Sequence, residues 1–152
     1  MSAARLLVTC GHLQRHVERY RAGLEAEGIE LFVPPLTAQQ FGAEEMKQFI
    51  SDVDTVIAGD DVIDRDVLET GKAARLKAVV KWGIGTDGID KKAARELELP
   101  VYNTPGAFSE EVADLALGMV IGLARSIPKI DTEVRAGKWP RYEGTSLTGK
   151  TV

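Results

Sequence analysis

A glycine-rich segment, Gly83 to Gly88, has the clearest chemical meaning in the sequence, because it reads G-x-G-x-x-G. It follows an apolar run that predicts a strand and precedes a segment that predicts a helix, as a dinucleotide-binding loop does. However, it follows the fourth predicted strand rather than the first, and the next strand ends in Tyr102 and Asn103 instead of an acidic residue. The backbone N–H groups of such a loop can hold an anion, a small carboxylate as well as a phosphate. A tight structural turn is the alternative interpretation.

Three other candidates follow predicted strands. Cys10 lacks the Arg six positions later that a phosphatase-type nucleophile needs, so we expect a small buried thiol. Asp60 and Asp61 stand where a receiver domain holds its phosphoacceptor, but the other residues of such a site are missing, so we expect a solvated acidic loop. His12 and His16 are one turn apart and lack further metal ligands nearby, so we predict no metal site. His12 remains a candidate for the ligand crevice at the carboxyl edge of the sheet.

The elements that must position these residues alternate between strand and helix signals. This alternation predicts an α/β fold with a flavodoxin-like open five-stranded parallel sheet and helices on both faces. A helix over 109–124 is apolar all round and is therefore predicted to be buried, with Ser109 as its N-cap. An amphipathic helix follows over 127–137, and residues 149–152 resemble the start of another strand. The predicted strands are 5–10, 29–33, 55–58, 76–80 and 100–103, and the predicted helices between them are 17–28, 43–50, 64–68 and 91–97.

Composition excludes several classes of protein. The 152 residues carry a net charge of −4, which argues against a nucleic-acid partner, and 44% are hydrophobic, as in a globular domain. No apolar run is long enough to span a bilayer, so we expect no membrane association. The single cysteine cannot form an internal disulfide, which fits a reducing, cytoplasmic compartment.

Five segments carry a family resemblance: Leu76 to Asp90, Pro100 to Ala107, Glu111 to Gly118, Ala124 to Pro128 and Arg135 to Trp139. In order and spacing they resemble the D-isomer-specific 2-hydroxyacid dehydrogenases, most of all the phosphoglycerate dehydrogenase-like branch. The resemblance is looser before Leu76. It implies NAD or NADP as the cofactor and a small 2-hydroxy or 2-oxo acid as the substrate.

The resemblance also implies roles for individual residues. The backbone of Gly83 to Gly85 would hold the substrate's carboxylate, and Ile84 would touch the nicotinamide, so this loop would not be the dinucleotide loop. Asn103 and Val112 would lie at the cleft between two domains. The residues predicted to bind substrate are Trp82, Gly83, Ile84, Gly85, Asp60, Asn103 and His12, and those predicted to contact the cofactor are Ile84 and Val112.

By the same resemblance, residues 1–103 form a substrate-binding domain, and residues 104–152 form an interdomain helix and arm that lead into a Rossmann dinucleotide-binding domain. The family's catalytic Arg, Glu and His correspond to positions beyond Val152, so we expect no catalytic residue in these 152 and no activity from them alone. The segment 109–142 would form a homodimer. A stand-alone module that binds a small carboxylate is the alternative.

The pair Asp60 and Asp61 departs from relatives with phosphorylated substrates, which often have a basic or hydroxyl residue there. Two acids would repel a second anionic group on the substrate. We therefore expect a smaller or less anionic 2-oxo acid than a phosphoglycerate analogue.

Overall fold

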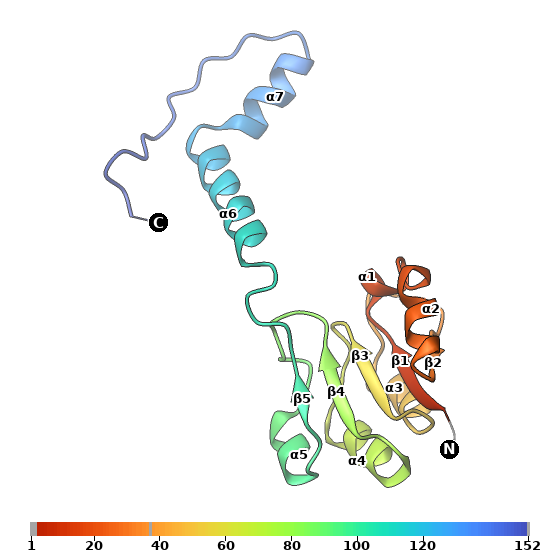
Figure 1. Cartoon of the computed structure of the whole chain (residues 1–152). Coiled ribbons are helices and arrows are strands. Elements are labelled where there is room, and N and C mark those ends of the chain that lie inside the picture. The colour runs from red at the N-terminus through yellow and green to blue at the C-terminus, as the bar shows by residue number, and fades with distance from the viewer. Residues whose placement is uncertain (1–2, 37, 152) are drawn as a thin grey trace. The chain divides into compact units, whose positions relative to one another are not determined.

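The computed structural model describes residues 3–36 and 38–151. The chain forms two compact units, Met1–Ala107 and Phe108–Val152, and each is described by itself. The first unit is built around a five-stranded sheet (Figure 1). Its elements in chain order are β1 (Ala4–Val8), α1 (Gly11–Gln14), α2 (Glu18–Ala26), β2 (Ile29–Phe32), α3 (Ala43–Ile50), β3 (Thr55–Ala58), α4 (Arg65–Ala74), β4 (Ala78–Lys81), α5 (Lys91–Glu96) and β5 (Val101–Tyr102).

All strand pairs are parallel, and the strand order is β2-β1-β3-β4-β5. This is the flavodoxin-like order, so the predicted fold class is confirmed. Parallel strands that are covered on both faces need apolar residues on both sides, and the short runs of Val, Ile, Leu and Ala in β1, β3 and β4 provide them. The carboxyl ends of all five strands therefore meet at one edge of the sheet.

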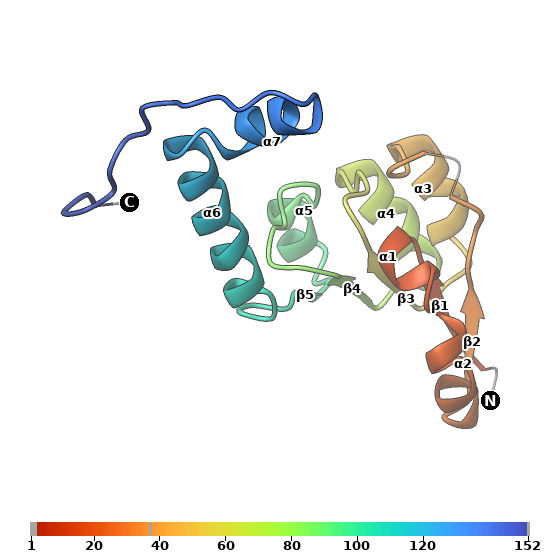
Figure 2. The ribbon, with the colours of Figure 1, turned by 90° about the horizontal axis from the view of Figure 1, so that it is seen from above.

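Each face of the sheet has its own helical cover. On one face, Leu7, Val56 and Val79 are fully buried under the apolar sides of α3, α4 and α5. On the other face, Leu6 and Val8 pack with residues of α1 and α2. Figure 2 shows α3, α4 and α5 along one side of the sheet and α2 on the other.

Two predicted helix starts are confirmed, and a short helix that was not predicted precedes the one expected over 17–28. The side chain of Asp64 accepts a hydrogen bond from the Val67 N–H, and that of Asp90 accepts one from the Ala93 N–H, as N-caps do. The helix predicted over 17–28 is α2, and the short helix α1 precedes it across a turn at residues 15–17. This turn places Leu13 in α1 and Leu24 in α2 against the same face of the sheet.

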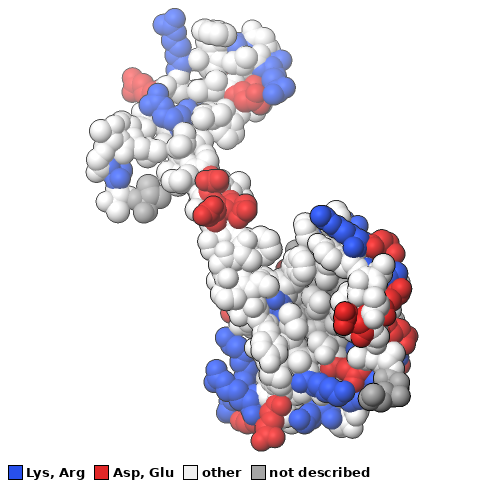
Figure 3. Space-filling view, in the orientation of Figure 1, with Lys and Arg blue, Asp and Glu red and all other residues white. Residues whose placement is uncertain are grey.

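The second unit contains α6 (Ser109–Ala124) and α7 (Ile127–Arg135), followed by residues without helix or strand up to Thr151. Ser109 is the first helical residue rather than the N-cap, which is Phe108. The prediction that α6 is buried is wrong within the described chain, since Leu115 is 60% exposed and Leu123 is 77% exposed. Figure 3 shows a mostly uncharged surface over this helix.

The strand expected over 149–152 does not form in residues 149–151, and Val152 lies outside the described residues. A strand needs a partner for its backbone groups, and the described part of the second unit contains none. Among the described helices, none is long and apolar enough to cross a membrane.

Candidate carboxylate-binding site

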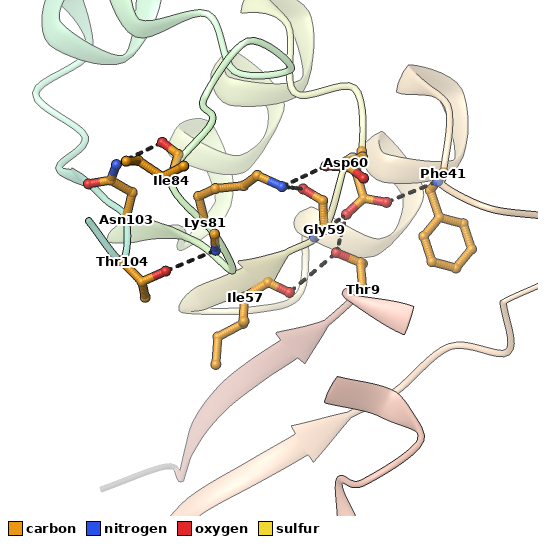
Figure 4. Close-up of polar contacts among 11 residues, drawn as sticks. Thr9, Phe41, Ile57, Gly59, Asp60, Lys81, Ile84, Asn103 and Thr104 are labelled. Carbon is orange, nitrogen blue, oxygen red and sulfur yellow. Dashed lines mark hydrogen bonds and ion pairs between the residues drawn. The ribbon is translucent and has the colours of Figure 1, made fainter. Parts of the chain in front are cut away.

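The carboxyl edge of the sheet brings several loop segments together. The glycine-rich loop from Gly83 to Gly88 follows β4, the turn at Gly59 to Asp61 follows β3, and Asn103 with Thr104 follows β5. Figure 4 shows these segments and the polar contacts between them. Ligands of open α/β sheets bind at this edge, so we expect a functional site there.

The three glycines of the loop have different physical roles. Gly83 has a φ of +130°, a conformation that L side chains rarely adopt. A Cβ on Gly88 would lie 2.6 Å from the carbonyl oxygen of Asp61, so only glycine lets the loop pack against the turn after β3. A Cβ on Gly85 would meet nothing closer than 3.7 Å, so neither backbone conformation nor packing requires a glycine there. The loop is therefore held at its two ends and open at its middle glycine.

Residues after β5 fix the first half of the loop. The Gly83 N–H donates to Thr104 Oγ1 at 3.1 Å, and the Thr104 N–H donates to the Gly83 carbonyl at 3.0 Å. The Asn103 side-chain amide donates to the Ile84 carbonyl at 2.9 Å. Within the described residues, the N–H groups of Ile84 and Gly85 have no acceptor. Fixed carbonyls and unpaired amides in one loop are the arrangement that holds an anion such as a carboxylate. We call Gly83 to Gly85 the cradle.

The end of the same loop does not suit a pyrophosphate. Helix α5 begins three residues after Gly88, and the Asp90 carboxylate caps it by accepting from the Ala93 N–H at 2.8 Å. A dinucleotide loop instead offers the free N-terminus of its helix to the phosphates. The Asp90 carboxylate fills that place and adds a repelling charge, so the motif is not a pyrophosphate-binding loop.

The two acids after β3 have unlike environments. Asp61 is buried, and its carboxylate accepts hydrogen bonds from the Thr9 hydroxyl, from the Phe41 N–H at 2.9 Å and from the Gly59 N–H at 2.9 Å. The interpretation of Asp60 and Asp61 as one solvated acidic loop is therefore wrong for Asp61. Its charge stabilises the fold by tying together three segments that are far apart in the sequence.

Asp60, in contrast, is exposed, and its carboxylate accepts from Lys81 Nζ at 2.8 Å. Lys81 ends β4, and its side chain is only 10% exposed. The expected repulsion of a second anionic group therefore cannot come from two equivalent free acids. A cavity of about 200 Å³ is lined by Asp60 and Lys81 together with Gly85 of the cradle.

Trp82 and His12 lie near each other on the face of the sheet that α1 and α2 cover. The half-buried Trp82 ring packs with the apolar residues beneath α1 and α2, and its centroid is 6.5 Å from that of His12. His12 is exposed, with its Nδ1 3.2 Å from an Arg15 guanidinium nitrogen, and its ring is 5.6 Å from that of His16. In the part of the chain that the structure describes, no three His, Cys, Asp or Glu side chains are grouped to hold a metal.

The two residues expected to contact a cofactor belong to different units. The Ile84 side chain projects from the cradle and is 64% exposed. Val112 lies in α6 of the second unit and is also 64% exposed. The structure thus groups the cradle with Asn103, Asp60 and Lys81, pairs His12 with Trp82, and places Val112 in the second unit.

A larger cavity, of about 490 Å³, lies between α2 and the sheet. Its walls are mainly apolar, from residues such as Leu6, Val17 and Leu24. Apolar walls do not compensate the charge of a carboxylate, so this larger space is a weaker candidate for an anion site than the cradle.

Comparison with known proteins identifies the family of this chain. The family model for the catalytic domain of D-isomer specific 2-hydroxyacid dehydrogenases matches residues 16–151. The chain belongs to this family. Among curated dehydrogenases of the family, a hydroxypyruvate reductase of Thermotoga maritima is 35% identical over 120 residues, which are 77% of this chain and 39% of the relative. A D-3-phosphoglycerate dehydrogenase of Methanocaldococcus jannaschii is 38% identical over 72% of this chain and 21% of the relative.

Solved structures agree with this 2-hydroxyacid dehydrogenase assignment. A Thermus thermophilus protein matches with a TM-score of 0.72 and 26% identity, over 94% of this chain and 45% of that one. The NAD+-bound 3-phosphoglycerate dehydrogenase of Entamoeba histolytica matches with a TM-score of 0.68 and 25% identity, over 95% of this chain and 43% of that one. The chain therefore spans less than half the length of each of these four proteins.

Two site residues were not predicted from the sequence. Thr104 and Lys81 lie within segments that carry the family resemblance, but neither was among the residues predicted to bind the substrate. The available signal was position, because both residues follow or end a buried strand at the edge that carries the cradle. For Lys81, a lysine that ends an otherwise apolar strand needs a nearby anion, and the neighbouring strand β3 leads directly to Asp60.

Proposed function

We propose that these residues are the substrate-binding part of an NAD(P)-dependent oxidoreductase. The reaction is hydride transfer between the nicotinamide and C2 of a small D-2-hydroxy or 2-oxo acid. The observation that carries the proposal is the cradle, whose Ile84 and Gly85 amides are unpaired while Thr104 and Asn103 hold the loop. Membership of the dehydrogenase family agrees with this use of the loop.

The cradle's contribution to the reaction is positioning. Two amides directed at one carboxylate fix the acid's first carbon, and the neighbouring C2 is then confined near Ile84. Because the loop's carbonyls are already engaged by Asn103 and Thr104, the amides need no rearrangement when the acid binds. Trp82 directly precedes the cradle and its ring lies 6.5 Å from that of His12, so we propose that the two rings limit the size of the acid's remaining substituent.

The cofactor fits this chain only in part. When bound, it supplies or accepts the hydride. The exposed apolar side chain of Ile84 suits contact with the face of a nicotinamide ring, and we propose the same for Val112. The Asp90 cap excludes the pyrophosphate from the glycine-rich loop. We therefore propose that a dinucleotide-binding domain outside these 152 residues holds most of the cofactor and supplies the catalytic side chains.

The domain and partner assignments follow from this proposal. Residues 1–103 are the substrate-binding domain, and residues 104–152 are the interdomain helix and arm. We propose that the segment 109–142 forms a homodimer, since α6 carries exposed apolar side chains along its length and Trp139 is 82% exposed. The single, unpaired Cys10 fits the reducing cytoplasm.

The test is a kinetic assay of the full-length protein that contains these residues. We expect oxidation of NADH or NADPH with glyoxylate or hydroxypyruvate. The Asn103→Ala variant removes the hydrogen bond to the Ile84 carbonyl, and we expect it to raise KM for the acid about tenfold with a smaller change in kcat, because it loosens ground-state and transition-state binding alike.

The Gln48→Ala variant is the matched control, since it also removes an exposed amide but from α3. It should leave both constants near those of the parent protein. Binding of the acid with no turnover by the full-length protein would instead favour the stand-alone carboxylate-binding module. Absence of both binding and turnover would refute the role of the cradle.

A further inference from the structure

A buried lysine at the end of β4 has its charge matched by one exposed acid. Lys81 Nζ donates to the Gly59 carbonyl at 2.6 Å and to Asp60 Oδ1 at 2.8 Å, and its side chain is only 10% exposed. An ammonium group removed from water in this way requires an anion or strong acceptors nearby. Asp60 supplies that anion.

Within the described structure, the Asp60 side chain forms no other hydrogen bond or ion pair. Its side chain is 72% exposed, and Lys81 is the donor that its carboxylate meets there. The next residue, Asp61, differs from Asp60, because its carboxylate is buried and accepts hydrogen bonds from three donors. These bonds connect separate segments of the fold. An ion pair with one exposed partner contributes little to stability. The carboxylate of Asp60 therefore acts chiefly on Lys81.

The pair lies directly beside the cradle. The cavity of about 200 Å³ lined by Asp60 and Lys81 is also lined by Gly85 and Asp87. A Cβ on Gly83 would lie 4.0 Å from Lys81 Cε, so the lysine stem runs past the first residue of the cradle. Figure 4 shows Lys81 extended from β4 toward Asp60 and Gly59, with Ile84 nearby. A substituent of the acid held at the cradle can therefore reach this pair.

We propose that Asp60 is a positioning residue that sets substrate specificity through Lys81. By holding the ammonium, Asp60 keeps Lys81 from pairing with a second anionic group of the substrate, and the nearby Asp87 carboxylate adds to the repulsion. The site therefore selects 2-oxo acids whose only anionic group is the carboxylate bound at the cradle. Removal of the Asp60 charge releases Lys81 to receive a phosphate. This inference rests on the proposed function and deepens it.

The test compares hydroxypyruvate with its 3-phosphate in the full-length protein. The readout is the ratio of the two kcat/KM values, phosphorylated over unphosphorylated. We expect Asp60→Asn to raise this ratio about tenfold, because an unneutralised lysine then faces the phosphate. The increase should shrink at high salt, as an electrostatic effect does and a packing effect does not.

Two further variants isolate the role of Lys81. Asp87→Asn removes the same charge from the same cavity without releasing Lys81, so its ratio should rise far less than that of Asp60→Asn. Lys81→Met keeps the buried stem but lacks the ammonium, and the double variant with Asp60→Asn should lose the gain. Equal ratios for Asp60→Asn and Asp87→Asn, or a gain that persists in the double variant, would overturn the proposal.

A binding measurement separates this proposal from the proposed function. Calorimetric titration of the 152-residue chain with inorganic phosphate needs no cofactor and no turnover. We expect the Asp60→Asn chain to bind phosphate about tenfold more tightly than the parent at low ionic strength. If this gain appears while the full-length protein reduces no 2-oxo acid, the proposed function is wrong and the Lys81 mechanism stands. If turnover is found but neither gain appears, only the specificity proposal is wrong.

Discussion

Acidification should remove the contribution of one buried carboxylate, Asp54, to the free energy of unfolding. Asp54 lies just before β3 and is 5% exposed. Its carboxylate accepts from the Arg5 backbone N–H at 2.9 Å and pairs with Lys77 at 2.9 Å and with Arg75 at 2.5 Å. These contacts join the amino ends of β1, β3 and β4, at the edge of the sheet opposite the cradle.

The pKa of Asp54 gives the size and sign of this contribution. The Arg5 backbone hydrogen bond is the largest cause, and the Lys77 and Arg75 contacts add to it, so that the pKa falls from 3.8 to about 2 despite burial. Because the folded-state pKa is the lower one, the stabilisation is fully present above pH 3.8 and is lost as the pH falls through 2. The shift corresponds to about 2 kcal/mol at neutral pH and to about 1 kcal/mol at pH 3.

The assay is urea unfolding of the 152-residue chain and its Asp54→Asn variant from pH 7 to pH 3. The difference between their unfolding free energies should fall by about 1 kcal/mol over this range, since Asn cannot titrate. Any constant effect of the substitution cancels in this comparison. Asp66→Asn, on the exposed side of α4, is the control and should show a nearly constant difference. A difference for Asp54→Asn that does not change with pH would refute the assigned ion pairs.

Two further predictions concern packing and assembly. Gly88→Ala should lower the free energy of unfolding by about 1–3 kcal/mol in a denaturant titration, because its Cβ would lie 2.6 Å from the Asp61 carbonyl, whereas Gly85→Ala should cost far less. Equal losses for the two glycines would contradict the assigned packing. Leu123→Glu places a charge on the exposed apolar surface of α6, and we expect it to shift the full-length protein from dimer to monomer in light scattering. A dimer that withstands this change would exclude α6 from the interface.

The sequence was sufficient for the sheet and for the position of the cradle. Short apolar runs predicted all five strands, and parallel connections left the flavodoxin-like order as the expected one. The placement of Gly83 to Gly88 after the fourth strand indicated an anion site other than a dinucleotide loop, and the Asp90 cap now gives the structural reason. The predicted roles of individual site residues remain proposals.

Local patterns were insufficient where a segment's surroundings decide its structure. The short helix α1 was not predicted, and its Leu13 packs against the same face of the sheet as Leu24 of α2. Helix α6 forms as predicted, but an apolar composition implies burial only when a partner surface is present, and within the described chain α6 is exposed. Helical periodicity predicts a helix and says nothing of what covers it.

The sequence by itself thus determined the strands and the position of the glycine-rich loop, since these depend on neighbouring residues. Only the tertiary structure distinguished Asp60 from Asp61, which are adjacent and chemically identical. Asp61 is turned inward to donors from Thr9 and Phe41, while Asp60 faces Lys81, 21 positions later in the chain. The physical reason is that the charge balance of a site is set by side chains from different strands, and the packing of parallel strands decides which of them meet.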